Sequence, residues 1–191
     1  ARAAAGKVWK EGLKTVIAGL PNAGKSSLLN QLLAEERAIV TDIPGTTRDT
    51  ITESALIHGI PLVLVDTAGI REASDQIEQM GIARTHRELA QADLILAVLD
   101  ASQPLTAETR AWLATLQNKA AILLLNKTDL PLRADLAEVK ALTGAIPQVA
   151  IAARTGTGMD ELGNALATYV EQHRLQAGAD SVLLTNVRQE D

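Results

Sequence analysis

The sequence contains no cysteine and no phenylalanine, and only 2% of its 191 residues are aromatic. Without cysteine the chain forms no disulfide, holds no metal through a thiolate and uses no thiol in catalysis. We therefore expect a reducing, cytoplasmic location. Without phenylalanine the interior has to be built from leucine, isoleucine, valine and alanine, as in many α/β domains.

Long apolar runs are also missing. The longest, Leu94–Leu99 and Ala120–Leu125, have the length of a strand, which predicts no membrane span. The formal net charge of −5 argues against a strong nucleic-acid-binding surface on this chain. The length suits one compact domain, and the first residue is not Met, so we expect a piece cut from a longer protein.

Short apolar segments alternate along the chain with amphipathic ones of helical length. The expected strands are Thr15–Ala18, Pro61–Val65, Leu94–Leu99, Ala120–Leu125 and Gln148–Ile151, and the expected helices are Lys25–Leu33, Ile82–Gln91, Ala107–Leu116, Leu136–Leu142 and Met159–His173. This alternation predicts an α/β, doubly wound, mainly parallel sheet with helices on both faces. One exception is a hairpin, in which Ile51–Ile57 passes through His58–Gly59 into Ile60–Asp66 and adds one antiparallel strand.

A phosphate-binding loop follows the first strand and opens the first helix. Its sequence is Gly19-Leu20-Pro21-Asn22-Ala23-Gly24-Lys25-Ser26. Gly19 and Gly24 allow the backbone amides to turn inward, and the helix N-terminus adds partial positive charge. Lys25 is expected to reach the β- and γ-phosphates, and the Ser26 hydroxyl to bind magnesium. A glycine-rich turn that binds nothing is the alternative for this motif taken alone.

Two further motifs follow predicted strands and so belong to the same sheet edge. Asp66-Thr67-Ala68-Gly69 offers a carboxylate for the magnesium shell and a glycine amide near the γ-phosphate. Asn126-Lys127-Thr128-Asp129 is expected to recognise the base. A carboxylate at Asp129 that accepts two hydrogen bonds from guanine would be left unpaired by adenine, so this loop predicts guanine specificity. A polar helix-capping loop is the alternative.

These three motifs, in this order, resemble the translation-factor class of P-loop GTPases. The resemblance implies that Asn126 orients the base loop and contacts guanine, that Lys127 packs along the base, and that Ala152-Ala153-Arg154 replaces the usual Ser-Ala-Lys. Ala153 matches that pattern and would offer a backbone amide to guanine, whereas Ala152 and Arg154 depart from it. The nucleotide-binding residues implied are Asn22, Ala23, Gly24, Lys25, Ser26, Ser27, Thr46, Thr47, Asp66, Gly69, Asn126, Lys127, Asp129, Ala152, Ala153 and Arg154.

A finer resemblance comes from Thr41-Asp42-Ile43-Pro44-Gly45-Thr46-Thr47-Arg48-Asp49, together with Asn22 in the phosphate loop. These segments are similar to the bacterial TrmE-Era-EngA group of GTPases, and within it to the G domain of the MnmE (TrmE) family of tRNA-modification GTPases. The resemblance implies a G domain at 14–173, with 1–13 and 174–191 as flanks joining a helical region. It also implies GTP and GDP as substrate and product, with tRNA and a MnmG-type partner bound through the parent protein.

The same resemblance implies metal ions and self-association. Ser26, Thr47 and Asp66 would bind magnesium, with Thr46 as a less favoured replacement for Thr47. Potassium would bind Asn22 and the loop residues Thr41, Ile43 and Thr46. A potassium ion there would place positive charge where other systems insert an arginine, and the G domains would dimerise across the nucleotide face.

Catalysis leaves a gap in the sequence, because Ile70 follows Gly69 where many GTPases carry a water-orienting glutamine. Spacing alone does not choose among the polar residues that follow, which are Arg71, Glu72, Asp75 and Glu78. The resemblance implies Glu78 as the water-orienting residue, with Lys25 and Gly69 supporting phosphoryl transfer. Arg48 and Arg71 are alternatives to potassium as catalytic cations.

Three functional hypotheses remain open at this stage. The first is a tRNA-modification GTPase whose G domains dimerise. The second is a Der- or Era-like GTPase that acts in ribosome assembly, and the third is a pseudo-GTPase that binds nucleotide without turnover, which Ile70 favours and the intact phosphate loop opposes.

Overall fold

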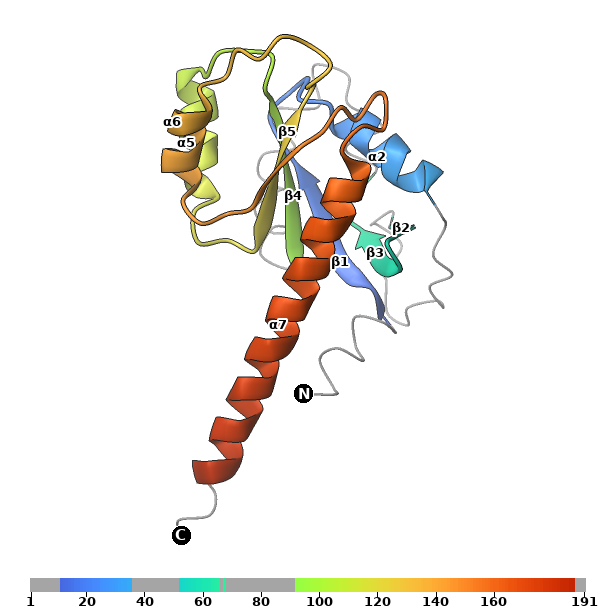
Figure 1. Cartoon of the computed structure of the whole chain (residues 1–191), viewed down its shortest axis with the longest axis vertical. Helices are drawn as coiled ribbons and strands as arrows, with labels where there is room; N and C mark the ends of the chain where they lie inside the picture. Colours follow the sequence, from blue (N-terminus) through green and yellow to red (C-terminus); the bar gives the residue numbers. More distant parts are fainter. Residues whose placement is uncertain (1–10, 36–51, 66, 68–91, 188–191) are drawn as a thin grey trace.

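The computed structural model describes residues 11–35, 52–65, 67 and 92–187, of which 174–187 are described only as helix. Within this part, six strands form one sheet in the order β2-β3-β1-β4-β5-β6 (Figure 1). They are β1 Leu13–Ala18, β2 Glu53–Ile57, β3 Ile60–Leu64, β4 Leu94–Asp100, β5 Ala121–Asn126 and β6 Gln148–Ala150. The β2–β3 pair is antiparallel and the other pairs of described strands are parallel. The predicted mainly parallel sheet with one antiparallel strand is confirmed.

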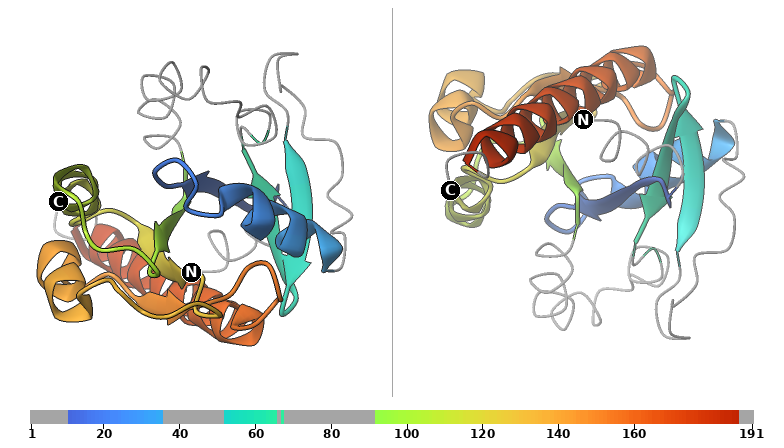
Figure 2. Two further views of the ribbon diagram at one scale, coloured as in Figure 1. Left: turned by 90° about the horizontal axis from the view of Figure 1, so that it is seen from above. Right: turned by 90° about the horizontal axis from the view of Figure 1, so that it is seen from below.

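Helices pack on both faces of this sheet, as Figures 1 and 2 show. The described helices are α2 Lys25–Ala34, α5 Ala107–Thr115, α6 Leu136–Thr143 and α7 Met159–Val187. Side chains of β4 alternate between two buried clusters: Leu96 and Val98 join α2 and α7, while Ala97 and Leu99 join α5 and α6. This alternation follows from the two-residue period of a strand and explains why β4 is apolar on both faces. The predicted helix Ile82–Gln91 lies outside the described residues.

Most element boundaries lie within two residues of the predicted ones, but α7 does not. It was expected to end at His173 and instead continues to Val187, projecting beyond the sheet (Figure 1). No proline interrupts the sequence after His173, and Leu, Gln and Ala are good helix formers, so nothing local stops the helix there. Within the described residues, no helix has the length and apolar character needed to cross a membrane.

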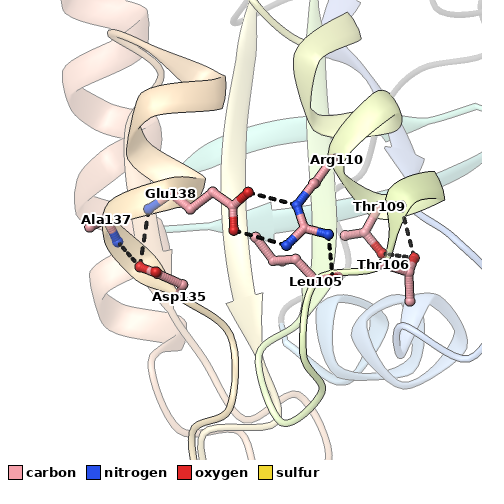
Figure 3. Close-up of polar contacts among 7 residues, drawn as sticks. All are labelled: Leu105, Thr106, Thr109, Arg110, Asp135, Ala137 and Glu138. Carbon is pink, nitrogen blue, oxygen red and sulfur yellow. Dashed lines mark hydrogen bonds and ion pairs between the residues drawn. The ribbon is translucent and has the colours of Figure 1, made fainter.

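Local polar contacts set the start of α5 and α6 and join the two helices (Figure 3). Thr106 Oγ1 accepts a hydrogen bond from the Thr109 amide at 3.1 Å, and Asp135 Oδ1 accepts from the Ala137 and Glu138 amides at 3.0 and 3.1 Å. Both are N-caps of the expected residue types. The Arg110 guanidinium meets the Glu138 carboxylate through two bonds of 2.6 and 3.2 Å, which join α5 to α6.

The parallel strands bring the phosphate loop and the base-recognition motif to one edge of the sheet. The phosphate loop follows β1, and the last residues of β4 and β5, Asp100 and Asn126, lie opposite each other in register. In the sheet β1 lies between β3 and β4. After β1 the chain forms β2 and β3 on one side and then returns to the other side of β1 as β4, so the loop lies at the point where the strand order reverses. In open α/β sheets this is where ligands bind.

Candidate functional site

The phosphate loop has the backbone that anion binding requires. Asn22 has φ 61° and Gly24 has φ 103°, and α2 begins at the next residue, Lys25. No side chain caps the start of α2, and its first turn contains no acidic residue. The positive end of this helix is therefore not neutralised by the helix itself, which suits a phosphate group.

Lys25 lies across its own loop. Its Nζ donates to the carbonyl oxygens of Gly19 at 2.9 Å and Leu20 at 2.8 Å. These bonds hold the ammonium group over the loop, where the β- and γ-phosphates are expected. The next residue, Ser26, is exposed and Ser27 is half-buried, both in the first turn of α2.

The two loop glycines are also needed for packing. A Cβ on Gly19 would come within 2.6 Å of the Val98 carbonyl oxygen in β4, and a Cβ on Gly24 would overlap the Asn126 side-chain nitrogen. The sequence explained these glycines by the inward turn of the backbone amides. The structure adds a second reason, the close approach of the loop to β4 and to the base-recognition motif.

Asn126 joins three segments of the site. Its side chain is buried, with Nδ2 donating to the Ala23 carbonyl at 2.9 Å and Oδ1 accepting from the Ala153 amide at 3.0 Å. The residue therefore connects the phosphate loop, the end of β5 and the loop after β6. Because the Ala153 amide already has this partner, a guanine oxygen would have to share that donor with Asn126.

Lys127 turns back toward the phosphate loop from a left-handed backbone position, φ 67°. Its Nζ donates to the Asn22 carbonyl at 2.8 Å and pairs with Asp100 Oδ2 at 2.6 Å. Burial raises the pKa of the Asp100 carboxyl, but the hydrogen bonds from Lys127 and Ser102 outweigh burial and leave that pKa below its usual value. The Asp100 carboxyl is therefore ionised at neutral pH.

Asp129 and the three residues predicted to complete the base site lie together. The Asp129 carboxylate is 24% exposed and meets the Arg154 guanidinium at 3.4 Å, while Ala152 and Ala153 are buried. Arg154, which departs from the usual lysine, is 81% exposed and so makes a weak pair with Asp129. The carboxylate remains open enough to accept hydrogen bonds from a ligand.

Several predicted site residues lie outside the described residues: Thr41, Ile43, Thr46, Thr47, Arg48, Asp66, Gly69, Arg71, Glu72, Asp75 and Glu78. Among the described residues, no group of three His, Cys, Asp or Glu side chains could hold a metal ion.

Sequence reasoning missed Asp100 and Ser102. Ser102 donates its amide and its hydroxyl to Asp100 Oδ1, at 2.9 and 2.5 Å. A signal was present, because Asp100 follows a run of buried apolar residues at the end of a strand whose carboxyl end meets the phosphate loop. The predicted strand, Leu94–Leu99, stops one residue before this aspartate.

Comparison with known proteins identifies the family of this site. Residues 14–127, more than half of the chain, match the family model described as 50S ribosome-binding GTPase. The chain belongs to this family of GTPases. The prediction of a P-loop GTPase is thereby confirmed.

Curated relatives place the similarity within the family. The chain is 47% identical over 188 residues to the tRNA modification GTPase MnmE of Levilactobacillus brevis, covering 98% of this chain and 40% of the relative. It is 52% identical over 165 residues to MnmE of Natranaerobius thermophilus, covering 86% and 36%. The predicted MnmE-type G domain is confirmed, and the chain spans about two fifths of the length of the MnmE proteins that it matches.

Solved structures agree on the fold. Era in complex with MgGDPNP and part of 16S ribosomal RNA is 28% identical with a TM-score of 0.60, over 82% of this chain and 56% of that one. The G domain of T. maritima FeoB is 27% identical with a TM-score of 0.55, over 82% and 98%. Both have a lower sequence identity to this chain than the MnmE relatives have.

Proposed function

We propose that this GTPase domain serves tRNA modification, specifically of the wobble uridine, within a longer MnmE-type protein. The connection made by Asn126, whose side chain ties the phosphate loop to the predicted base loop, supports the nucleotide-binding part of this proposal. The level of identity to MnmE proteins, at about half of all positions, supports the cellular role. A MnmG-type partner and tRNA would then bind through the parent protein, in a cytoplasmic setting.

Guanine recognition would rest on the residues that Asn126 brings together. Asp129 would accept two hydrogen bonds from the base, Lys127 would lie along its face, and Ala153 would share its amide with a base oxygen. An adenine in this position would leave the Asp129 carboxylate without donors, which disfavours it strongly. The phosphates would meet the amides of residues 22–27 and the Lys25 ammonium group.

Two ions fit the chemistry of the loop. Magnesium would be held by Ser26, Thr47 and Asp66 and would neutralise charge between the β- and γ-phosphates. Potassium would be held by Asn22, Thr41, Ile43 and Thr46. Asn22 has an exposed side chain at the tip of the phosphate loop, a place from which an amide oxygen can reach a cation beside the nucleotide.

Hydrolysis would require residues outside the described part of the chain. Ile70 stands where many GTPases carry a water-orienting glutamine, so Glu78 would orient the attacking water instead. The Gly69 amide would contact the γ-phosphate. Lys25, held over the loop by Gly19 and Leu20, would stabilise the charge that develops on the transferred phosphoryl group. Two G domains would associate across the nucleotide face in the GTP state.

Comparing GTP hydrolysis in potassium and in sodium, at equal ionic strength and with magnesium, tests the finer parts of this proposal. Turnover in potassium should exceed turnover in sodium by roughly tenfold or more, because the ion acts directly on transition-state charge. Size-exclusion chromatography with a transition-state mimic should show dimers in potassium and monomers in sodium. Equal rates in both salts with a persistent monomer would overturn the potassium and dimerisation proposals and leave the GTPase assignment intact.

A Der- or Era-like role in ribosome assembly is the second candidate, favoured by the description of the matching family model and by the Era fold. Measuring association with ribosomal subunits and with tRNA separates the two roles, using the full-length parent protein. Nucleotide-dependent binding to ribosomal subunits without effect on tRNA modification would replace the proposal above.

A further inference from the structure

Three hydrogen-bond donors converge on the carboxylate of Asp100, a residue with no place in the predicted motifs. The Lys127 ammonium group approaches Oδ2 at 2.6 Å, and the Ser102 amide and hydroxyl approach Oδ1 at 2.9 and 2.5 Å. Ser102 is 5% exposed and fixed in the turn after β4. Ser102 therefore sets the orientation of the Asp100 carboxylate independently of Lys127.

The register of the sheet explains why this carboxylate meets that lysine. Asp100 lies directly opposite Asn126 in the β4–β5 pair, and the Ala101 amide donates to the Asn126 carbonyl at 3.0 Å. Lys127, one residue further, leaves the sheet with φ 67°, and its side chain spans from β5 to the Asn22 carbonyl. The ammonium group is held between the phosphate loop and Asp100.

We propose that Asp100 is a positioning residue for guanine-nucleotide binding, which acts by holding the Lys127 side chain extended across the base site before the nucleotide arrives. A lysine side chain loses considerable rotamer freedom when it is fixed. With the ammonium group already anchored, that loss occurs on folding instead of on binding, so the nucleotide binds more tightly. The inference rests on the proposed role of Lys127 along the face of guanine.

Only a carboxylate satisfies this arrangement. Lys127 and Ser102 both present donors, so the amide of Asp100→Asn would turn its NH₂ group toward one of them. The cost should appear mainly in binding, because the residue lies on the base side of the loop. Asp100→Asn should therefore weaken GDP binding by about three- to thirtyfold and raise KM more than it lowers kcat.

A double-mutant cycle on GDP affinity, measured by calorimetry on the full chain, tests whether Asp100 acts through Lys127. The four proteins are the parent, Asp100→Asn, Lys127→Met and the double variant. We expect Asp100→Asn to have less than about a twofold effect in the Lys127→Met background. An equal effect in both backgrounds, or parent-like affinity of Asp100→Asn, would overturn the inference.

A matched control is available at the α5–α6 contact. Glu138→Gln makes the same carboxylate-to-amide change opposite Arg110 (Figure 3), in a pair that includes neither Asp100 nor Lys127, and should leave GDP affinity unchanged. If Asp100→Asn does not fold, Ser102→Ala decides instead: a loss of about two- to fivefold in GDP affinity supports the inference, and parent-like affinity refutes it. If Lys127→Met alone binds GDP like the parent, the proposed base site itself fails, which is a distinguishable result.

Discussion

At the residue scale, the site depends on close contacts that the sequence motifs do not reveal. Gly24 illustrates this, because both its φ of 103° and its contact with the Asn126 side chain exclude a larger residue. The same asparagine satisfies the Ala23 carbonyl and the Ala153 amide from a buried position. The glycine and the asparagine, about a hundred positions apart in the sequence, therefore act as one unit.

Gly24→Ala should disrupt this unit. The added Cβ would push Asn126 away and place alanine in a left-handed conformation, for an expected loss of about 2–4 kcal/mol in unfolding free energy. GDP affinity should fall by roughly tenfold or more, because the loop amides move with the strain. Chemical denaturation and calorimetric titration with GDP measure the two effects.

Gly59→Ala is the matched control for that change. Gly59 has φ 75°, but nothing lies within 4 Å of the position of its Cβ. Only backbone strain of about 1–2 kcal/mol is expected, without a change in GDP affinity. If the two variants behaved alike, the contact between Gly24 and Asn126 would have no role of its own.

The motif residues could be predicted from sequence because their types and spacing carry the chemistry. Lys25 and Asn126 were predicted to lie at the sheet edge, and they do: α2 begins at Lys25 and β5 ends at Asn126. Asp100 was not identified, because a single aspartate after an apolar strand forms no recognisable motif. Its partner Lys127 is also distant in sequence. The pairing of Arg154 with Asp129 was missed for the same reason, because it depends on two loops that meet only in the fold.

At the element scale, the β2–β3 hairpin is attached to α7. The His58 ring lies against Gly163, where a Cβ would come within 2.5 Å of ring atom Nδ1, and its Nε2 contacts Asp160 Oδ1 at 3.2 Å. Glycine inside a helix normally weakens it. Its presence at position 163 is explained by the space that the histidine ring occupies.

This explanation predicts that the effect of Gly163→Ala changes sign with its neighbour. In the parent chain the substitution should destabilise by about 1 kcal/mol, since the ring must move. In a His58→Ala background the same substitution should stabilise by about 0.5–1 kcal/mol, the usual gain of alanine over glycine in a helix. Denaturant unfolding of the four proteins measures both values, and the same sign in both backgrounds would rule out the contact as the cause.

The order and type of the described elements were predictable, because periodicity and apolar runs determine them locally. The hairpin at His58–Gly59 followed from the turn residues between two apolar segments. The length of α7 did not follow, since the helix was predicted to cover Met159–His173 and instead continues to Val187. Leu, Gln and Ala are good helix formers and allow the helix to extend beyond the sheet.

At the scale of the whole molecule, Tyr169 ties α7 to the sheet. Its hydroxyl donates to the Asp93 carbonyl at 2.5 Å, and burial, with the nearby Asp93 charge, raises the pKa of Tyr169 to about 12. It is the only tyrosine in the chain, so its ionisation can be followed directly by ultraviolet absorbance. The neutral phenol is the form that the fold stabilises.

Stability should therefore fall at alkaline pH through this residue. Because the folded pKa is raised from 10.0 to about 12, the contribution of Tyr169 is complete below pH 10 and is lost as the pH rises to about 12. The loss should be on the order of 1–2 kcal/mol after screening by solvent. Tyr169→Phe should be less stable at neutral pH and show a flatter decline over that interval, and parallel declines for both proteins would refute the assignment.

We expect the loop around Asn126 and Asp129 to select guanine over other bases, and base selectivity is the property to measure. Asp129→Asn replaces an acceptor of two hydrogen bonds with a group that can donate, so it should bind xanthine, whose second ring position carries an oxygen in place of an amino group. The measurement is turnover of GTP and XTP by the parent chain and by this variant. We expect kcat/KM for GTP to fall by about a hundredfold or more in the variant, while kcat/KM for XTP rises. An unchanged preference for GTP would refute guanine selection by Asp129.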